Sequence, residues 1–275
     1  MIIIPFTNPI RFKGIDYFDF DFYSKSCQYL QKWQKGDVIY LQFLADESVT
    51  IKVVDKATNI SVLTVNSVVI PTYLVDQDFD VYEASISLSD IDYGCYYLKI
   101  TNSENESVIS HTFDYQEFWP ETLLLKYSNS ENDFDTIFDT GIEFMLRVEG
   151  VIHNFTPKTD TDVYFSQRKN PVQLFANPFR QFTLQIGRAK GVSEWIADLF
   201  NLAFACDQKS IDSVKFERNE GADWEVIRVD NYPLIGMSIE ILPKENQNSG
   251  FVIGSYVLGD SDENAIFTDS YMKIS

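Results

Sequence analysis

A single stretch of this chain has the periodicity of an amphipathic α-helix, and almost all the rest has the alternation or turn spacing of short β-strands. The helical stretch lies within residues 188–207, where one helix face collects apolar side chains: Val192, Trp195, Ile196, Leu199, Leu202, Ala203 and Cys206. Gly191 and Ser193 mark its start, and Glu194 lies in the first turn, where the helix dipole favours negative charge. We therefore expect a mainly β protein with one packed helix near 192–206.

The first part of the chain has the strand spacing of a β-sandwich. Six segments bounded by Gly, Asp, Asn or Ser have strand character: 38–44, 49–54, 60–65, 67–74, 81–88 and 95–101. Residues 17–23 add an alternating strand with three phenylalanines on one face. Residues 89–98 resemble the tyrosine corner of immunoglobulin-like sandwiches, in which the hydroxyl of Tyr96 or Tyr97 would return to the backbone upstream. These features predict an N-terminal immunoglobulin-like β-sandwich.

A break in the strand rhythm predicts two domains. Pro120 ends the rhythm, and Trp119 beside it is expected to wedge between the domains 1–119 and 120–275. The second domain is predicted to be β-rich around the single helix, with a hairpin turn across Asp212 and Ser213 and with turns at the Asn–Pro pairs that begin at Asn170 and Asn177. Its expected strands are 122–127, 142–149, 162–166, 172–176, 179–186, 224–229, 235–242 and 251–257.

The overall charge disfavours two classes of partner. The chain has 22 basic and 41 acidic residues, a net charge of −19, whereas nucleic acids and anionic membranes are bound by clustered Lys and Arg. The three cysteines, Cys27, Cys95 and Cys206, have no paired spacing, and Pro5 interrupts the short apolar run at the N-terminus. We expect folding in a reducing cytoplasm, with neither a signal peptide nor a membrane span.

One segment departs from the acidic background. From Val163 to Ser193 there is no acidic residue, and five residues are basic: Arg168, Lys169, Arg180, Arg188 and Lys190. This segment is either a fluctuation in ordinary solvated strand ends or an electropositive edge that meets an acidic surface on a neighbouring subunit. Opposite charges on one molecule favour heterologous contacts, so these five residues are the candidate interface.

No motif for catalysis is present, and we expect no catalytic residue, no cofactor and no metal, so the chain is predicted not to be an enzyme. His111 and His153 have no partner at metal-ligand spacing. Asp76, Asp78 and Asp80 mimic the start of a calcium loop, but the glycine and the distal glutamate are missing, so a solvated turn is expected. The two carboxylates that hydrolyse a glycoside are brought together by the fold and need not be close in the sequence. Nothing in the sequence therefore selects a pair.

Three blocks of the chain, 33–43, 122–135 and 195–225, are similar to uncharacterised virion proteins of Bacteroidetes phages and prophages, including crAss-like phages. More loosely, a sheet-rich domain with one helix followed by a hairpin resembles tail-tube and distal-tail proteins, whose copies assemble into rings. Here a sandwich precedes that domain instead of following it, which leaves peripheral tail and baseplate roles open. The resemblance implies a structural subunit of a tail, neck or baseplate, assembled in the host cytoplasm, whose partners are copies of itself and other virion proteins.

An alternative from another class is a carbohydrate- or receptor-binding module of adhesin type. It would use exposed aromatic side chains such as Trp33, Trp119 or Trp224 as stacking platforms. A binding module would present these rings in an exposed row beside polar loops, whereas an assembly subunit would bury them at a contact.

Overall fold

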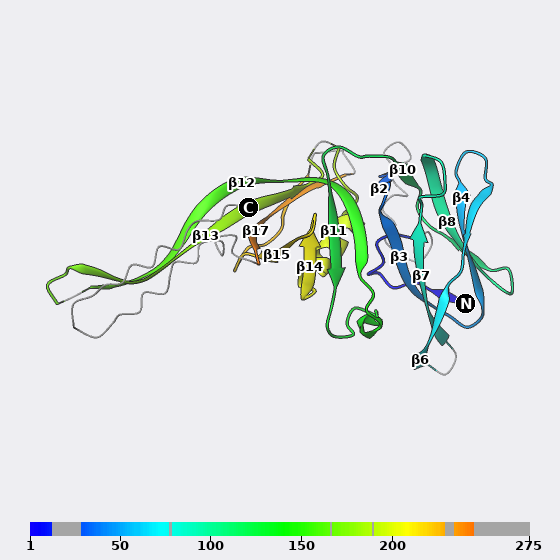
Figure 1. Cartoon of the computed structure of the whole chain (residues 1–275), viewed down its shortest axis with the longest axis horizontal. Coiled ribbons are helices and arrows are strands. Elements are labelled where there is room, and N and C mark those ends of the chain that lie inside the picture. Colours follow the sequence, from blue (N-terminus) through cyan, green and yellow to red (C-terminus); the bar gives the residue numbers. More distant parts are fainter. Residues whose placement is uncertain (13–28, 77–78, 166, 189, 229–233, 245–275) are drawn as a thin grey trace, which may run out of the picture.

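The computed structural model describes residues 1–12, 29–76, 79–165, 167–188, 190–228 and 234–244. In this part of the chain the fold is mainly β, with three sheets and one α-helix (Figure 1). The fold class predicted from the sequence is therefore confirmed. The predicted strands at 17–23 and 251–257, together with Cys27 and Asp78, lie outside the described residues.

Two sheets, antiparallel except for the parallel pair of β2 and β10, pack face to face in the first half of the chain. One has the order β1 (Ile2–Ile3), β3 (Val38–Ala45), β7 (Phe79–Ser87), β6 (Val68–Asp76). The other has the order β2 (Gln31–Gln34), β10 (Phe113–Gln116), β8 (Gly94–Asn102), β4 (Val49–Asp55), β5 (Ser61–Val65), with β9 (Ser107–Ile109) also pairing with β8. Their facing side chains form one core, which includes Leu41, Ile51, Ile86, Leu98 and the fully buried Trp33.

The connections of this sandwich are those of the immunoglobulin type. β3 and β7 are paired in one sheet, and β4, β8 and β10 are neighbours in the other, with β2 running parallel to β10. The hydroxyl of Tyr96, at the start of β8, donates a hydrogen bond of 2.7 Å to the carbonyl oxygen of Asp92. The tyrosine corner predicted from residues 89–98 is thereby confirmed, with Tyr96 as its tyrosine.

The third sheet, in the second half, closes on itself. Its order is β13 (Pro171–Ile186), β12 (Phe144–Phe165), β11 (Thr122–Ser128), β14 (Gln208–Ile211), β15 (Val214–Arg218), β17 (Gly236–Pro243), β16 (Glu225–Ile227). Because β13 also pairs with β17, six of these strands form a closed circuit of antiparallel neighbours. The predicted hairpin is confirmed: Asp212 and Ser213 both have positive φ, 47° and 70°, as a tight turn between β14 and β15 requires.

The single helix, α1 (Glu194–Ala205), packs on this closed sheet through a face that overlaps the predicted one, except that Trp195 and Leu202 are only partly buried and Phe200 and Phe204 are buried in addition. Its buried side chains are Ile196, Leu199, Phe200, Ala203 and Phe204. The approach to the helix is tight: Gly191 has φ +80°, and a Cβ there would lie 2.7 Å from the Cβ of Leu234. Glycine at this position is therefore required both by the backbone conformation and by the space.

Two pairs of predicted strands are single long strands. The predicted strands 142–149 and 162–166 are parts of β12, and 172–176 and 179–186 are parts of β13. The prediction of a turn at Asn177 was wrong, because Asn177 and Pro178 lie inside the β12–β13 ribbon, with Pro178 opposite Thr159. On a ribbon with open edges, a proline can occupy a strand without breaking a ladder hydrogen bond. Asn170, in contrast, does lie between the two strands.

A buried polar joint connects the two halves. Arg147 on β12 makes two hydrogen bonds to Asp37, 2.6 Å from Nε to Oδ2 and 2.8 Å from Nη2 to Oδ1, and both side chains are almost fully buried. Gln42 on β3 bonds both backbone groups of Ile137, at 2.7 and 2.8 Å. Trp119, the expected wedge, donates its ring N–H to the carbonyl of Trp33 at 3.1 Å. The domain boundary at residue 119 stays a prediction; the sandwich and the closed sheet are joined through specific buried partners.

Candidate interaction surface

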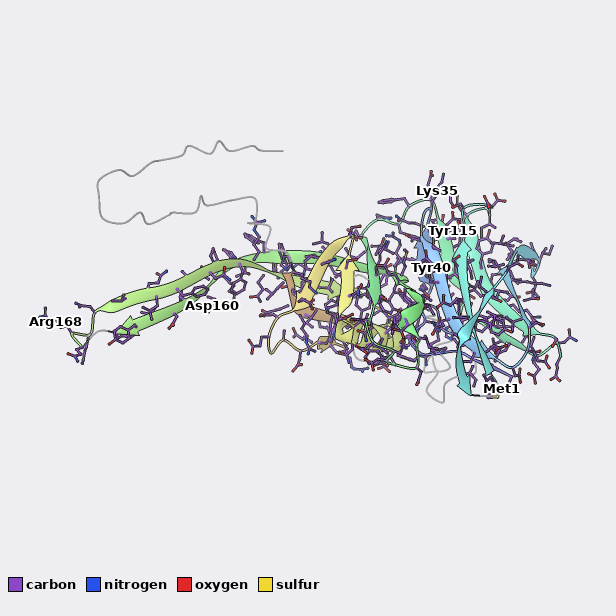
Figure 2. The ribbon with its side chains drawn as sticks, turned by 60° about the horizontal axis from the view of Figure 1, so that its bottom comes forward. Met1, Lys35, Tyr40, Tyr115, Asp160 and Arg168 are labelled. Atoms are coloured by element: carbon purple, nitrogen blue, oxygen red, sulfur yellow. The ribbon has the colours of Figure 1, made fainter. Side chains whose placement is uncertain are left out.

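The most unusual feature of the molecule is a two-stranded arm that projects from the closed sheet. β12 and β13 leave the body together and extend well beyond it, with Asp160 along the arm and Arg168 at its end (Figures 1 and 2). All side chains of 154–165 on β12 and of 171–178 on β13 are exposed. At about 3.3 Å per residue, the β12 part of the arm is roughly 40 Å long.

An aromatic cluster supports the root of the arm. The rings of Phe155 and Phe182 lie 5.7 Å apart, and the guanidinium of Arg180 lies over the Phe155 ring at 5.7 Å. The pairing register shifts between His153 and Thr156, and a bulge of this kind bends a ribbon and increases its twist. The direction in which the arm leaves the body is therefore set by side chains at its root.

The far end of the arm, which we call the arm tip, consists of the described residues 163–165 and 167–175. It carries an exposed apolar cluster: Val163, Tyr164, Phe165, Val172, Leu174 and Phe175, with exposed fractions from 40% to 64%. Tyr164 lies opposite Val172 in the register and shares its face of the ribbon, whereas Val163 and Phe165 alternate with Tyr164 and project from the other face. Exposed apolar patches mark interaction sites, so the arm tip, with large apolar side chains on both faces, is the strongest candidate for an interaction surface.

The five basic residues predicted as an interface are not gathered in one patch. Arg168 and Lys169 are exposed in the turn of the arm tip, and Arg180 lies at the root against Phe155. Arg188 and Lys190 are exposed in the segment between β13 and α1. The structure thus separates them into a tip pair, a root residue and a pair near the helix; only the tip pair lies beside the exposed apolar cluster.

Sequence reasoning missed the apolar part of this surface. Residues 162–166 and 172–176 were predicted only as strands, and their composition does not distinguish a strand that faces a core from one that faces water. The signal that could have revealed the arm is the proline content, because Pro157, Pro171 and Pro178 all lie in or at the ends of strands where a central position would exclude them. Taken together with the apolar tip, these prolines indicate a ribbon that pairs with no further strand among the described residues.

The loop that follows β11 is acidic. Residues 129–139, the acidic loop, contain the exposed side chains of Glu131, Asp133, Asp135 and Asp139 and no basic residue. Phe134 lies among these carboxylates and is 40% exposed. The loop is held in place by hydrogen bonds of its own: Asn132 bonds the side chain and the backbone N–H of Asp139, at 2.7 and 3.1 Å.

The tryptophans considered as stacking platforms do not form an exposed row. Trp33 is fully buried, and Trp119 and Trp224 are only partly exposed. Trp224 packs edge-on against Phe200 and Phe204 of α1, with ring centroids 6.1 and 5.3 Å away. Lys32 lies 4.7 Å above the ring of Trp119. These contacts are structural. Of the exposed aromatic side chains that the structure describes, four lie on the arm (Phe155, Tyr164, Phe165 and Phe175) and four lie on the body (Phe6, Tyr93, Phe118 and Phe134).

The described residues contain no group of three side chains suited to hold a metal ion. His153 contacts the side-chain oxygen of Gln185 at 3.1 Å. Cys95 and Cys206 are free thiols, and burial raises the pKa of Cys206 to about 11, which suppresses the reactive thiolate. Among the described helices, none is long and apolar enough to cross a membrane.

Comparison of the chain with models of known protein families, with curated protein sequences and with solved structures gives no match.

Proposed function

We propose that this chain is a structural subunit that acts by protein–protein assembly, with the β12–β13 arm as its principal contact element. The observation that carries the proposal is the exposed apolar cluster at the arm tip. A two-stranded hairpin is marginally stable alone in water, and fully burying a large apolar side chain is worth about 1.5–3 kcal/mol. Docking of the arm tip on another protein would therefore order the arm and remove the exposed apolar surface from water.

Within this proposal, a place in a phage tail, neck or baseplate is supported by the similarity of 33–43, 122–135 and 195–225 to virion proteins. A ring subunit or an adaptor would both use a projecting arm to reach a neighbour. The partners would be copies of this chain and other virion proteins. The buried pair of Asp37 and Arg147 supports such a role as well, because it would transmit a load on the arm to the sandwich.

The alternative, a carbohydrate- or receptor-binding module, has less support. Its expected platforms, Trp33, Trp119 and Trp224, are buried or packed against other side chains. The exposed rings of the arm are Phe and Tyr on a narrow ribbon, next to apolar Val and Leu side chains. Such a mixture suits an apolar protein surface better than a sugar ring.

The proposal is tested by light scattering on the purified full-length chain across a range of concentrations at low and high salt. We expect a multimer whose mass falls as salt rises, because part of the contact is between exposed charges. A chain that stays a monomer under every condition would contradict self-assembly. A glycan array on that monomer would then test the alternative.

A further inference from the structure

We infer that the arm tip docks on the acidic body of a second copy of this chain, in a heterologous contact that includes the acidic loop 129–139. This inference rests on the proposed assembly function and specifies its partner and its geometry. It starts from two surfaces of unlike character on one molecule: an apolar tip with two cations, Arg168 and Lys169, and a loop with four carboxylates around an exposed Phe134.

The described body of the same molecule does not cover the arm tip. Every side chain of 154–165 is exposed, and Arg168 lies at the far end of the arm, away from the residues labelled on the sandwich (Figure 2). The ribbon is roughly 40 Å long at about 3.3 Å per residue, and it leads away from the loop that carries Phe134. A contact between the tip and the acidic loop therefore requires two molecules.

Charge argues against a symmetric contact between two arm tips. Such a contact would place Arg168 and Lys169 of one copy beside the same two cations of the other. Like charges brought together in a partly dehydrated interface are unfavourable when the two turns meet, because the nearest carboxylates of the arm, Asp160 and Asp162, lie on β12 outside the tip. A heterologous contact pairs the tip with opposite charge instead.

The rest of the chain supplies that opposite charge. Without the five basic residues of 163–193, the chain has 17 basic and 41 acidic residues, a net charge of −24. The electrostatic field of this negative charge attracts the basic tip of another copy towards the body. The same charge makes the contact of two bodies unfavourable. The acidic loop offers a local match, because Phe134 provides an aromatic face beside carboxylates that Arg168 and Lys169 can pair with.

The arm is built to bind through side chains more than through its strand edges. Pro157 and Pro178 lie within the paired part of the ribbon and have no backbone N–H to donate. Prolines on an open edge hinder the addition of a further strand. The apolar tip and its two cations are left as the contact, which gives a heterologous joint that closes into a ring or continues as a filament according to the rotation between copies.

Paired variants of the full-length chain test the two components of the contact. We expect R168E/K169E, and separately F165S/L174S, to weaken self-association at least tenfold in sedimentation or light scattering. The matched controls are K52E/K215E, which reverses two exposed cations on the body, and I60S/V62S, which removes two exposed apolar side chains from the sandwich; we expect both to assemble as the wild type does. All these side chains are exposed, so thermal melts should coincide and loss of assembly cannot be attributed to unfolding. If both arm variants assemble as the wild type does, the inference is wrong.

A photo-crosslinking residue at position 165 then identifies the acceptor. In an equimolar mixture of isotopically light and heavy chains, we expect crosslinks between light and heavy copies that join the tip to a peptide containing 129–139. Crosslinks from tip to tip, or only to residues 245–275 of the same copy, would overturn the inference. A charge swap adds an independent check: D133K/D135K should restore assembly when mixed with R168E/K169E, and failure of this rescue excludes the acidic loop as the acceptor.

Failure of self-assembly and failure of the arm-tip contact give different results. If the wild-type chain is a monomer at all concentrations and salts, both the proposed self-assembly and this inference are wrong. If the wild-type chain assembles and the arm variants assemble equally well, the assembly function stands and only the role of the arm tip is overturned.

Discussion

Asp37 and Arg147 are the two residues on which the connection between the halves depends most. Their bidentate pair is almost fully buried, with side chains 4% and 7% exposed. Each group has a further partner: Asp37 accepts the backbone N–H of Gln34 at 2.9 Å, and Arg147 donates to Thr122 at 3.1 Å. The net stabilisation by a buried ion pair is small because both charges lose water, but removal of one partner leaves the other charge unpaired.

We therefore predict that Arg147→Met lowers the free energy of unfolding by about 3–5 kcal/mol, as measured by urea denaturation. The double variant D37L/R147M should recover most of this loss, because no charge is left buried without a partner. A loss below about 1 kcal/mol in the single variant would show that water reaches Asp37 and that the joint is not dry.

At the level of elements, β12 combines two roles in one strand. Its first part pairs with β11 and carries Arg147 into the joint, and its second part forms one side of the arm. The residues of β12 are buried or partly buried up to His153 and exposed from Asn154 onward, close to the register shift at the root of the arm. Folding of the body therefore depends on the first part of β12, whereas the second part buries little surface beyond the contact of Phe155 with Phe182 and Arg180.

We predict that the arm can be removed without loss of the fold. Thr156 and Gln181 lie directly opposite each other, so residues 157–180 can be replaced by Asn–Gly, which closes two paired residues in a two-residue hairpin turn. The free energy of unfolding should change by less than about 1 kcal/mol, because the excised side chains are mostly exposed. Thermal melts followed by circular dichroism measure this change, and light scattering should show that assembly is lost. Unfolding of the shortened chain would show that the arm contributes to the core.

At the scale of the whole molecule, the sandwich and the arm lie at opposite ends, with the closed sheet and α1 between them (Figure 1). Two apolar cores are present, and each is contacted by a residue from the other half of the chain. Tyr29 belongs to the core of the closed sheet, and Met145 packs against the core of the sandwich. Tyr127 also donates a hydrogen bond of 2.5 Å to the backbone oxygen of Thr7. The halves are therefore structurally dependent on each other despite their separate sheets.

This dependence predicts that the fragment 1–119 does not fold stably alone. Without residues 120–275, Asp37 and Gln42 lose their partners Arg147 and Ile137, and Tyr29 loses its apolar surroundings. We expect poor dispersion in an NMR spectrum of the isolated fragment and recovery when 120–275 is co-expressed. A well-dispersed spectrum of the fragment alone would instead support an autonomous N-terminal domain.

Local patterns in the sequence were sufficient for most of the elements. The alternation of β3, β4, β7 and β8, the apolar face of α1 and the Asp212–Ser213 turn depend on neighbours within a few residues, and each was predicted at nearly its observed position. The tyrosine corner at Tyr96 is also local, because donor and acceptor are four residues apart. The charge contrast of 163–193 against the rest of the chain is likewise a property of the sequence alone.

The tertiary structure alone decided which surfaces are covered. An apolar strand has the same sequence pattern whether it faces a core or water, so the exposure of Phe165 and Leu174 depends on strand order and on the absence of a neighbouring strand along the described arm. The same holds for Pro178, whose place inside a strand is possible only on an open ribbon. The partners of Asp37 and Gln42 are distant in the chain, and sequence periodicity carries no information on such long-range pairs. Secondary structure follows from local chemistry, whereas the arm and the joint depend on how the sheets come together.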